Sequence, residues 1–494
     1  MSADLILAVD QGTTSTRAIA FDGELQPVAS AAIPLDTAHP RPGWVEQDAE
    51  AILESVVAAV ERVLVEVGGT GRIGALGLDN QGETVVAWDA ETGRALAPAV
   101  VWQCRRSLPV VERLQAAGLE PAIRERTGLP LDPYFSAGKM TWLLEEVPAV
   151  AEAAARGTLR LGTVDAWLTA RLDGGDARTD ASTASRTQLL SLVTGDWDAG
   201  LLRWFAVPPA ALPRIVPTAG ELGGLRHPRW GGELRLTAMA CDQQAALAGH
   251  GAFAAGSLKA TYGTGVFVLA NAGDRRTPAA GLETSIAWRL PGGVTATVLQ
   301  GGLFTAGAFV DWLRDELGLI AEPAETAALA ASVPDTAGVR VLPALAGLGA
   351  PWWRPSATAV IAGLTAAAGR PHLVRAALDG IAHGVADLVE AMAAELPAPP
   401  RRLRVDGGLT ANGYLMQRQA DLLGLPVDVA RAEESTALGI AGLAGIGAGR
   451  WGPDQLSAAS PIRTTWLPRL DQADRLAERE AWRRFVNAAA GLGG

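Results

Sequence analysis

The chain begins with the stretch that decides its fold, Leu5-Ile6-Leu7-Ala8-Val9-Asp10-Gln11-Gly12-Thr13-Thr14-Ser15-Thr16-Arg17. Five apolar residues predict a short buried strand, which ends at an acid and is followed by a tight, hydroxyl-rich turn. Residues 18–21 return as a second strand. Gly12 lets the backbone approach a ligand closely, and the turn's N–H groups and hydroxyls suit phosphate oxygens. We expect a phosphate-binding hairpin with Asp10 beside a magnesium ion, against the plainer alternative of an ordinary hairpin with a polar tip.

Length and composition indicate a multidomain globular protein. A chain of 494 residues predicts two or more domains, and 49% hydrophobic with 19% charged residues is an ordinary composition. A net charge of −11 argues against nucleic acid as a partner, because that needs a basic face. Cys104 and Cys241 are too few for a disulfide framework, which favours a reducing compartment.

No targeting or membrane segment is expected. The N-terminal apolar run lacks a preceding basic region and is too short for a signal peptide. The weakly polar stretch 436–449 is too short and too rich in glycine to span a bilayer. The sequence therefore predicts a cytoplasmic protein without membrane insertion.

The first 84 residues predict half of an actin-like ATPase fold. The strand pair is followed by a third strand at 26–34, and Asp48 is placed to cap a helix with apolar residues at helical spacing. A strand at 73–77 then leads into Asn80-Gln81-Gly82-Glu83-Thr84. This order, three strands, a helix and a strand, is typical of that fold.

A second hairpin of the same kind lies far downstream. Strands at 258–262 and 266–270 flank Gly263-Thr264-Gly265, which repeats the pattern of strand, Gly/Thr turn and strand. Two such hairpins predict a duplicated architecture with one nucleotide between two lobes, since ligands commonly bind at domain interfaces. We expect domains at 1–250 and 251–494, with the boundary among the small residues of 249–256. The alternative is two unrelated hairpins.

Two more glycine-rich turns support a nucleotide site. Residues 301–307 lead into a helix expected at 308–317, and a strand at 402–405 runs into Asp406-Gly407-Gly408 with a helix expected to start near Thr410. A strand followed by Gly-Gly and a helix N-terminus suits the phosphates or adenosine of a nucleotide.

The ordered motifs resemble the FGGY carbohydrate kinases along nearly the whole chain, and within them the glycerol kinases. The first family signature resembles residues 134–146, and the second resembles residues 359–364 with 372–379. Glycerol-kinase-like stretches occupy 42–46, 101–106, 162–168, 242–247 and 348–353.

The resemblance implies an α/β fold of two actin-like (ribonuclease H-like, βββαβα) domains, with ATP and Mg²⁺ in the cleft between them. It implies phosphorylation of a terminal hydroxyl of a small polyol by a homo-oligomer, a dimer or a tetramer. It places Asp10 near the metal. For the nucleotide it implies Thr13, Thr14, Ser15, Arg17, Thr264, Gly307, Asp311, Gly408 and Asn412, although the family often has Gln where this chain has Asp311. For the acceptor it implies Glu83, Trp102, Tyr134, Asp242, Gln243 and Phe267, with Gly82 at the departure described below.

Asp242 is the expected catalytic base. An alcohol is a poor nucleophile, so a carboxylate that takes its proton accelerates the transfer. From the residues alone, Asp242 before Gln243-Gln244 is also a good helix N-cap. The family resemblance favours the base, and the two roles are compatible.

The main departure from the family is Gly82. Glycerol kinases usually read Asn-Gln-Arg-Glu-Thr where this chain has Gly82 as the third residue, and the missing Arg is a substrate ligand in the family. Loss of one or two charge-assisted hydrogen bonds would weaken glycerol binding roughly tenfold to several hundredfold. We expect an empty volume here, filled by another Arg or by a longer polyol. Better glycerol use by Gly82→Arg would mark this position as a specificity change.

Three alternatives therefore stand beside glycerol. In the first, the acceptor is another polyol or a ketose, such as erythritol, threitol or xylulose. In the second, the chain is a non-catalytic actin-like ATP switch. Least favoured is a sugar-responsive DNA-binding regulator, since no basic face or extra helix-turn-helix segment is found in the sequence.

Overall fold

The first sheet grows from the opening hairpin as expected. The computed structural model describes residues 3–431 and 434–491. The first hairpin pairs β1 with β2 antiparallel, and β1 pairs with β5 parallel. The strand order is β11-β12-β5-β1-β2-β3. The bounds are β1 (Leu5–Gln11), β2 (Ser15–Phe21), β3 (Pro27–Pro34), β5 (Ile73–Asn80), β11 (Ala219–His227) and β12 (Gly232–Cys241).

Helix α1 (Ala49–Val67) begins where its sequence predicts. The Asp48 carboxylate accepts a hydrogen bond from the Glu50 N–H at 2.9 Å, which satisfies one of the free donors of the first turn. Ile52, Val56 and Val60 are buried against the sheet, and Gly68 ends the helix with φ 89°. The helix covers β2 and β3 and so completes the βββαβ unit.

The second sheet repeats the topology of the first. Strand β13 pairs antiparallel with β14, and parallel with β19. The order is β15-β16-β14-β13-β19-β20-β21, so five central strands follow the same sequence of neighbours as β3-β2-β1-β5-β12. The expected duplication is confirmed. The bounds are β13 (Leu258–Tyr262), β14 (Val266–Asn271), β15 (Glu283–Arg289), β16 (Thr295–Leu303), β19 (Leu403–Asp406), β20 (Val427–Ala430) and β21 (Ile462–Trp466).

One helix start in the second half differs from expectation. The helix expected near Thr410 begins only at Gly413, because residues 408–411 form a 3₁₀ turn and the Asn412 side chain caps the helix by accepting from the Leu415 N–H at 3.0 Å. The helices that cover this sheet or lie beside it are α10 (Gly307–Asp315), α11 (Glu325–Ala331), α12 (Arg370–Glu395), α13 (Gly413–Leu423) and α16 (Gln472–Ala489).

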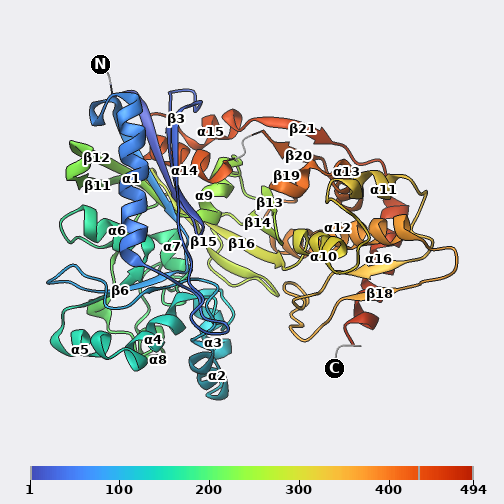
Figure 1. The fold of residues 1–494 in the computed structure, drawn as a ribbon, viewed down its shortest axis with the longest axis horizontal. Helices are drawn as coiled ribbons and strands as arrows, with labels where there is room; N and C mark the ends of the chain where they lie inside the picture. The colour runs from blue at the N-terminus through green and yellow to red at the C-terminus, as the bar shows by residue number, and fades with distance from the viewer. Residues whose placement is uncertain (1–2, 432–433, 492–494) are drawn as a thin grey trace.

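Helix α14 (Ser435–Gly447) comes late in the chain but packs against elements of the N-terminal half. It packs against β1, β5 and β12 of the first sheet and against α9 (Asp242–Gly249), so it lies among the N-terminal elements (Figure 1). A Cβ added at Gly439 would lie 1.8 Å from the Ala245 carbonyl oxygen, and one at Gly249 would lie 1.9 Å from that of Ser435. The two helices therefore touch backbone to backbone. The expected domain boundary near residues 249–256 stays a prediction.

The remaining N-terminal elements form a smaller layer beside the first sheet. The layer contains the sheet β4-β7-β6-β8 and the helices α2 (Leu108–Ala116), α3 (Glu120–Thr127), α4 (Ser136–Glu146), α5 (Pro148–Arg156), α6 (Val164–Leu172), α7 (Ala181–Ser185) and α8 (Ala199–Trp204); its strands are β4 (Glu46–Gln47), β6 (Val85–Asp89), β7 (Ala99–Val100) and β8 (Leu159–Thr163).

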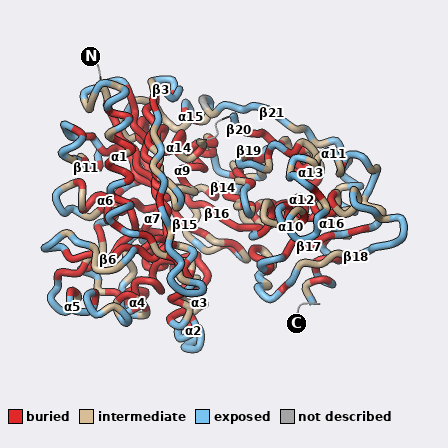
Figure 2. Tube along the Cα trace, viewed as in Figure 1, coloured by how far each residue is buried: buried red, intermediate tan, exposed pale blue. Residues whose placement is uncertain are grey.

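Buried residues concentrate inside each half (Figure 2). None of the described helices is long and apolar enough to cross a membrane.

Candidate active site

Three acidic residues lie at the edge where the central strands of the first sheet end. Asp10 on β1 is the direct register partner of Asp79 on β5, and Asp242 follows the last residue of β12. Because β1, β5 and β12 are parallel, their carboxyl ends lie at one edge of the sheet. Asp79 was not among the sequence candidates. The pairing of the first and fourth strands of a βββαβ unit was the signal that would have found it.

These acids are crowded enough to perturb one another. Burial, and then the charge of Asp10, raises the pKa of Asp79 well above its usual value. Burial also raises the pKa of Asp10. Burial, followed by the charges of Glu83 and Asp10, raises the pKa of Asp242 to about 7. A carboxyl with such a pKa accepts a proton readily near neutral pH.

The Asp10–Asp79 pair fits a divalent cation. The two carboxyl groups lie within hydrogen-bonding reach, yet neither buried oxygen of Asp79 has an N–H or O–H partner among the described residues. Their contact therefore needs a shared proton, which a cation would replace. No group of three acidic, His or Cys side chains in the described part of the chain converges on one metal position. Mg²⁺ suits such a site, since it commonly takes one or two carboxylates and completes its shell with phosphates and water.

The first phosphate turn is held by one backbone hydrogen bond and by one from the side chain of Gln47. The Gly12 N–H donates to the Ser15 carbonyl at 3.0 Å, and the Gln47 amide donates to the Thr13 carbonyl at 2.6 Å. Thr14 is exposed, and Thr13 and Ser15 are half-buried. Arg17, expected to reach the nucleotide, forms an ion pair with Glu434.

The second phosphate turn is locked to the start of α10. The Gly307 N–H donates to the Gly263 carbonyl at 3.1 Å, and the Ala306 and Ala308 N–H groups both reach the Thr264 carbonyl at 2.8 and 3.0 Å. Thr264 is exposed. The structure therefore brings two of the expected nucleotide residues, Thr264 and Gly307, into one unit.

The other expected nucleotide residues lie on separate elements. Asp311 is exposed on α10 and pairs with Arg314 at 3.1 Å. Gly408 starts the 3₁₀ turn after β19 and faces open space. The Asn412 side chain caps α13 and also donates to Thr326 at 2.9 Å. The Asn412 side chain is thus already engaged within the protein.

An aromatic wall connects the expected acceptor residues to the first phosphate turn. The Trp102 and Tyr134 rings pack edge to face with centroids 5.6 Å apart, and Tyr134 packs in the same way on Phe135 at 5.1 Å. The Trp102 indole N–H donates to the Thr13 hydroxyl at 2.9 Å. The acceptor wall therefore positions a residue of the phosphate turn.

Removing that indole hydrogen bond should weaken ATP use. We expect Trp102→Phe to raise the KM for ATP about two- to tenfold, because one net hydrogen bond that orders Thr13 is lost. Steady-state kinetics with varied ATP measure this change. Trp197→Phe is the matched control: it loses an equivalent indole bond, to the Pro213 carbonyl at 3.0 Å. An equal KM rise in both variants would contradict the proposed link.

Gln243 is oriented by a buried lysine. The chain has only two lysines, and both are fully buried. The Lys259 ammonium donates to the Gln243 side-chain oxygen at 3.1 Å and to the Thr261 hydroxyl at 2.9 Å. Thr261 is the cross-strand partner of Phe267. Lys259 therefore orients the side chain of Gln243, a role that sequence reasoning did not assign.

Asp242 does not cap α9 in the expected way. The N-cap position belongs to Cys241, and Asp242 is the first residue of the helix; its carboxylate accepts from the Gln243 N–H at 2.6 Å. The Cys241 thiol lies 3.4 Å from an Asp242 oxygen. Burial raises the pKa of Cys241 well above its usual value, so this residue is a neutral thiol.

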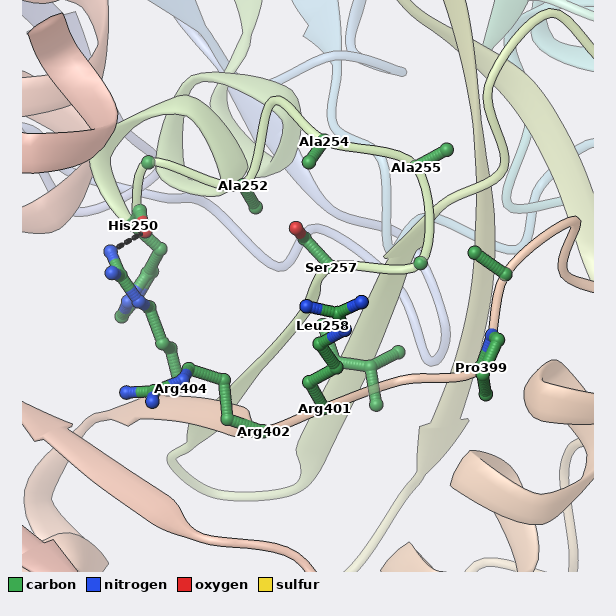
Figure 3. A pocket seen from close by; sticks show the side chains of 13 residues that line it. His250, Ala252, Ala254, Ala255, Ser257, Leu258, Pro399, Arg401, Arg402 and Arg404 are labelled. Atoms are coloured by element: carbon green, nitrogen blue, oxygen red, sulfur yellow. Dashed lines mark hydrogen bonds between the residues drawn. The ribbon is translucent and has the colours of Figure 1, made fainter. Parts of the chain in front are cut away.

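The structure also contains a pocket of about 340 Å³, whose lining side chains are drawn in Figure 3. It is lined by residues 250–252 and 254–258, by Ala398 and Pro399, and by Arg401, Arg402 and Arg404. His250 follows the C-terminal end of α9 and Leu258 begins β13, whereas Asp242 and the Gly263–Gly265 turn lie at the opposite ends of these elements. Helix α9 alone has eight residues, about 12 Å. This pocket is therefore not part of the site around Asp242.

Comparison with known proteins agrees with this arrangement. Residues 5–249 match the N-terminal domain, and residues 258–448 the C-terminal domain, of the FGGY family of carbohydrate kinases. The chain is 44% identical over 490 residues to a glycerol kinase of Citrifermentans bemidjiense, covering 99% of each chain. It is 46% identical over 489 residues to a glycerol kinase of Thermus brockianus, covering 98% of each. The crystal structure of Plasmodium falciparum glycerol kinase with ADP superposes with a TM-score of 0.94 at 31% identity over 98% of each chain. A xylulose kinase of Rhodospirillum rubrum, 24% identical over 99% of each chain with a TM-score of 0.88, shares the fold.

Proposed function

The chain belongs to the FGGY family of carbohydrate kinases, and from this premise we propose that it transfers the γ-phosphoryl group of ATP to a primary hydroxyl of glycerol, giving glycerol 3-phosphate and ADP. The observation that carries the proposal is the buried carboxyl group of Asp242, which lies close enough to Asp10, Glu83 and Tyr134 to interact with them electrostatically. Glycerol kinases 43–46% identical over the whole chain support glycerol as the acceptor.

The proposed reaction is one displacement at phosphorus. The acceptor oxygen attacks the γ-phosphorus, a new O–P bond forms, and the bond between that phosphorus and the bridging oxygen of ADP breaks. Asp242 takes the proton of the attacking hydroxyl. The two phosphate turns hold the triphosphate through backbone N–H groups and hydroxyls. Asp10, with Asp79 beside it, would hold Mg²⁺, and that ion would supply positive charge against the phosphate oxygens.

The raised pKa of Asp242 predicts a pH dependence. Below pH 7 the carboxyl is protonated and cannot accept the hydroxyl proton; above it the group is an active carboxylate. We expect kcat/KM for glycerol to rise about tenfold per pH unit below this pKa and to level off above it. Measurement of kcat/KM for glycerol as a function of pH checks this expectation, because this parameter reports ionisations of the free enzyme. A flat profile between pH 5 and about 8 would contradict a base with this pKa.

An acceptor panel decides between glycerol and its rivals. We expect purified protein with ATP and Mg²⁺ to show a higher kcat/KM for glycerol than for erythritol, threitol or xylulose. A higher value for a four- or five-carbon acceptor would favour the alternative raised by Gly82. ATP consumption that no acceptor increases would favour the actin-like switch. The homo-oligomeric state stays a prediction, which sedimentation of the purified chain tests.

A further inference from the structure

Position 82 has no room for a side chain. A Cβ added at Gly82 would lie 2.4 Å from the Cys241 sulfur and 3.8 Å from Cγ of Arg186. Cys241 cannot easily retreat, because it is 1% exposed and its N–H donates to the Ser182 hydroxyl at 2.9 Å. The expected empty volume is therefore absent. The sulfur of Cys241 and the stem of Arg186 occupy the space.

Arg186 lies beside the aromatic rings of Tyr134 and Phe135 and links the two halves of the chain. It follows α7 directly, and its side chain is 1% exposed. Its Nε donates to Glu83 Oε1 at 2.7 Å, and its Nη1 donates to Glu283 Oε2, on β15 of the second half, at 3.0 Å. The guanidinium carbon lies 5.7 Å from the centre of the Tyr134 ring. Arg186 thus touches two of the expected acceptor residues.

One donor of this guanidinium is unused. Nη2 is buried and has no hydrogen-bond partner among the described residues. In a guanidinium, Nη2 and Nε share one edge, so an Nη2 N–H lies beside the bond to Glu83. Glu83 accepts through Oε1, and its other carboxylate oxygen has no partner in the described part of the chain. A free N–H donor and a free carboxylate oxygen therefore lie next to each other.

This pair matches a single alcohol group. A hydroxyl accepts one hydrogen bond and donates another, so it satisfies Arg186 Nη2 and Glu83 Oε2 together. A buried donor without a partner is costly, which makes a ligand hydroxyl the natural complement. We propose that Arg186 is a specificity-determining residue that, with Glu83, binds a hydroxyl of the polyol other than the one phosphorylated. The proposal rests on the proposed kinase function and names the residue that serves where position 82 is glycine.

Deoxy analogues of glycerol test this role. Propane-1,2-diol and propane-1,3-diol each keep a primary hydroxyl but lack one of the other two. We expect R186K to lower kcat/KM for glycerol about ten- to a hundredfold, because Lys has no second donor along that edge. The kcat/KM for the diol that lacks the bound hydroxyl should fall less than about threefold, so the preference for glycerol over that diol shrinks. Equal losses for all three acceptors would overturn the proposal and leave Arg186 a structural residue.

Glu283→Gln is the matched control, because Glu283 holds the same guanidinium from the opposite side. We expect it to change kcat/KM for all three acceptors by one common factor. If R186K folds poorly, as judged by Tm, the double variant R186Q/E283Q takes its place, because it removes one positive and one negative charge together. Its kcat/KM values for glycerol and the two diols are then compared with those of the wild type. A selectivity shift with E283Q alone would count against assigning the hydroxyl to Nη2.

The Gly82→Arg variant tests independently whether the space beside position 82 is already filled. Because Cys241 already fills the space, we expect this variant to lose glycerol activity at least tenfold, the reverse of the improvement expected from the sequence. Improved glycerol use would overturn the proposal. The acceptor preference of the wild-type enzyme tests the proposed function separately. If another acceptor is preferred, R186K is compared with wild type on that acceptor and on its deoxy analogues. An equal loss of kcat/KM for all of them would still contradict the proposed role of Arg186.

Discussion

We expect replacement of Asp242 with Asn to lower kcat by about 10²–10⁴-fold, the usual contribution of a positioned general base. Asn keeps the size of the side chain and an oxygen that can accept from the Gln243 N–H, so the start of α9 is preserved. The variant loses only the ability to take the acceptor proton. Rapid-quench or steady-state measurement of ADP formation gives kcat, and the KM for glycerol should change little.

The matched control for this change is Asp165→Asn. Asp165 is also buried, and burial raises its pKa to about 7, but it lies at the start of α6 and accepts from the Thr163 hydroxyl at 2.5 Å. We expect this variant to shift Tm while leaving kcat unchanged. If Asp242→Asn retained kcat within tenfold of wild type, Asp242 would not be the base.

Replacing Gly307 with Ala should disrupt the second phosphate turn. The added Cβ would lie 2.6 Å from the Gly263 carbonyl oxygen, so either the turn or the start of α10 must move. Such a clash costs about 1–3 kcal/mol, and we expect the KM for ATP to rise about five- to a hundredfold. The KM for glycerol should rise less. Kinetics with each substrate varied in turn measure both effects.

Gly23→Ala is the control for Gly307→Ala. A Cβ at Gly23 meets nothing within 4 Å, and this residue lies in the turn after β2. Its kinetics should match wild type. An unchanged KM for ATP in Gly307→Ala would separate the Gly263–Gly265 turn from nucleotide binding.

Local sequence patterns predicted the frame of the fold well. The two hairpins, the Asp48 cap and the strand at 73–77 each follow from turn chemistry and apolar spacing within about twenty residues. Helix α14 could not be predicted in the same way. Its position on the first sheet depends on glycine contacts with α9, nearly two hundred residues earlier in the chain, and no local pattern records such contacts.

Candidate site residues could be named from the sequence where a motif contains them, and not where packing alone positions them; their roles stay predictions. Asp242, Glu83 and Tyr134 stand in recognisable motifs, and the structure places them around one group of contacts. Arg186 and Lys259 act through distant partners, Glu283 and Gln243, which the sequence separates by 97 and 16 residues. The empty volume expected beside Gly82 is absent for the same reason, because Cys241, at the end of β12, fills it; the expected alternative of another Arg agrees with the stem of Arg186 there.

The most direct test of glycerol phosphorylation is phosphorus NMR of a reaction containing purified protein, ATP, Mg²⁺ and glycerol. The proposed function predicts that glycerol 3-phosphate and ADP appear in equal amounts, and that neither accumulates when glycerol is omitted. Inorganic phosphate in place of glycerol 3-phosphate, or ADP formation that does not depend on glycerol, would contradict it.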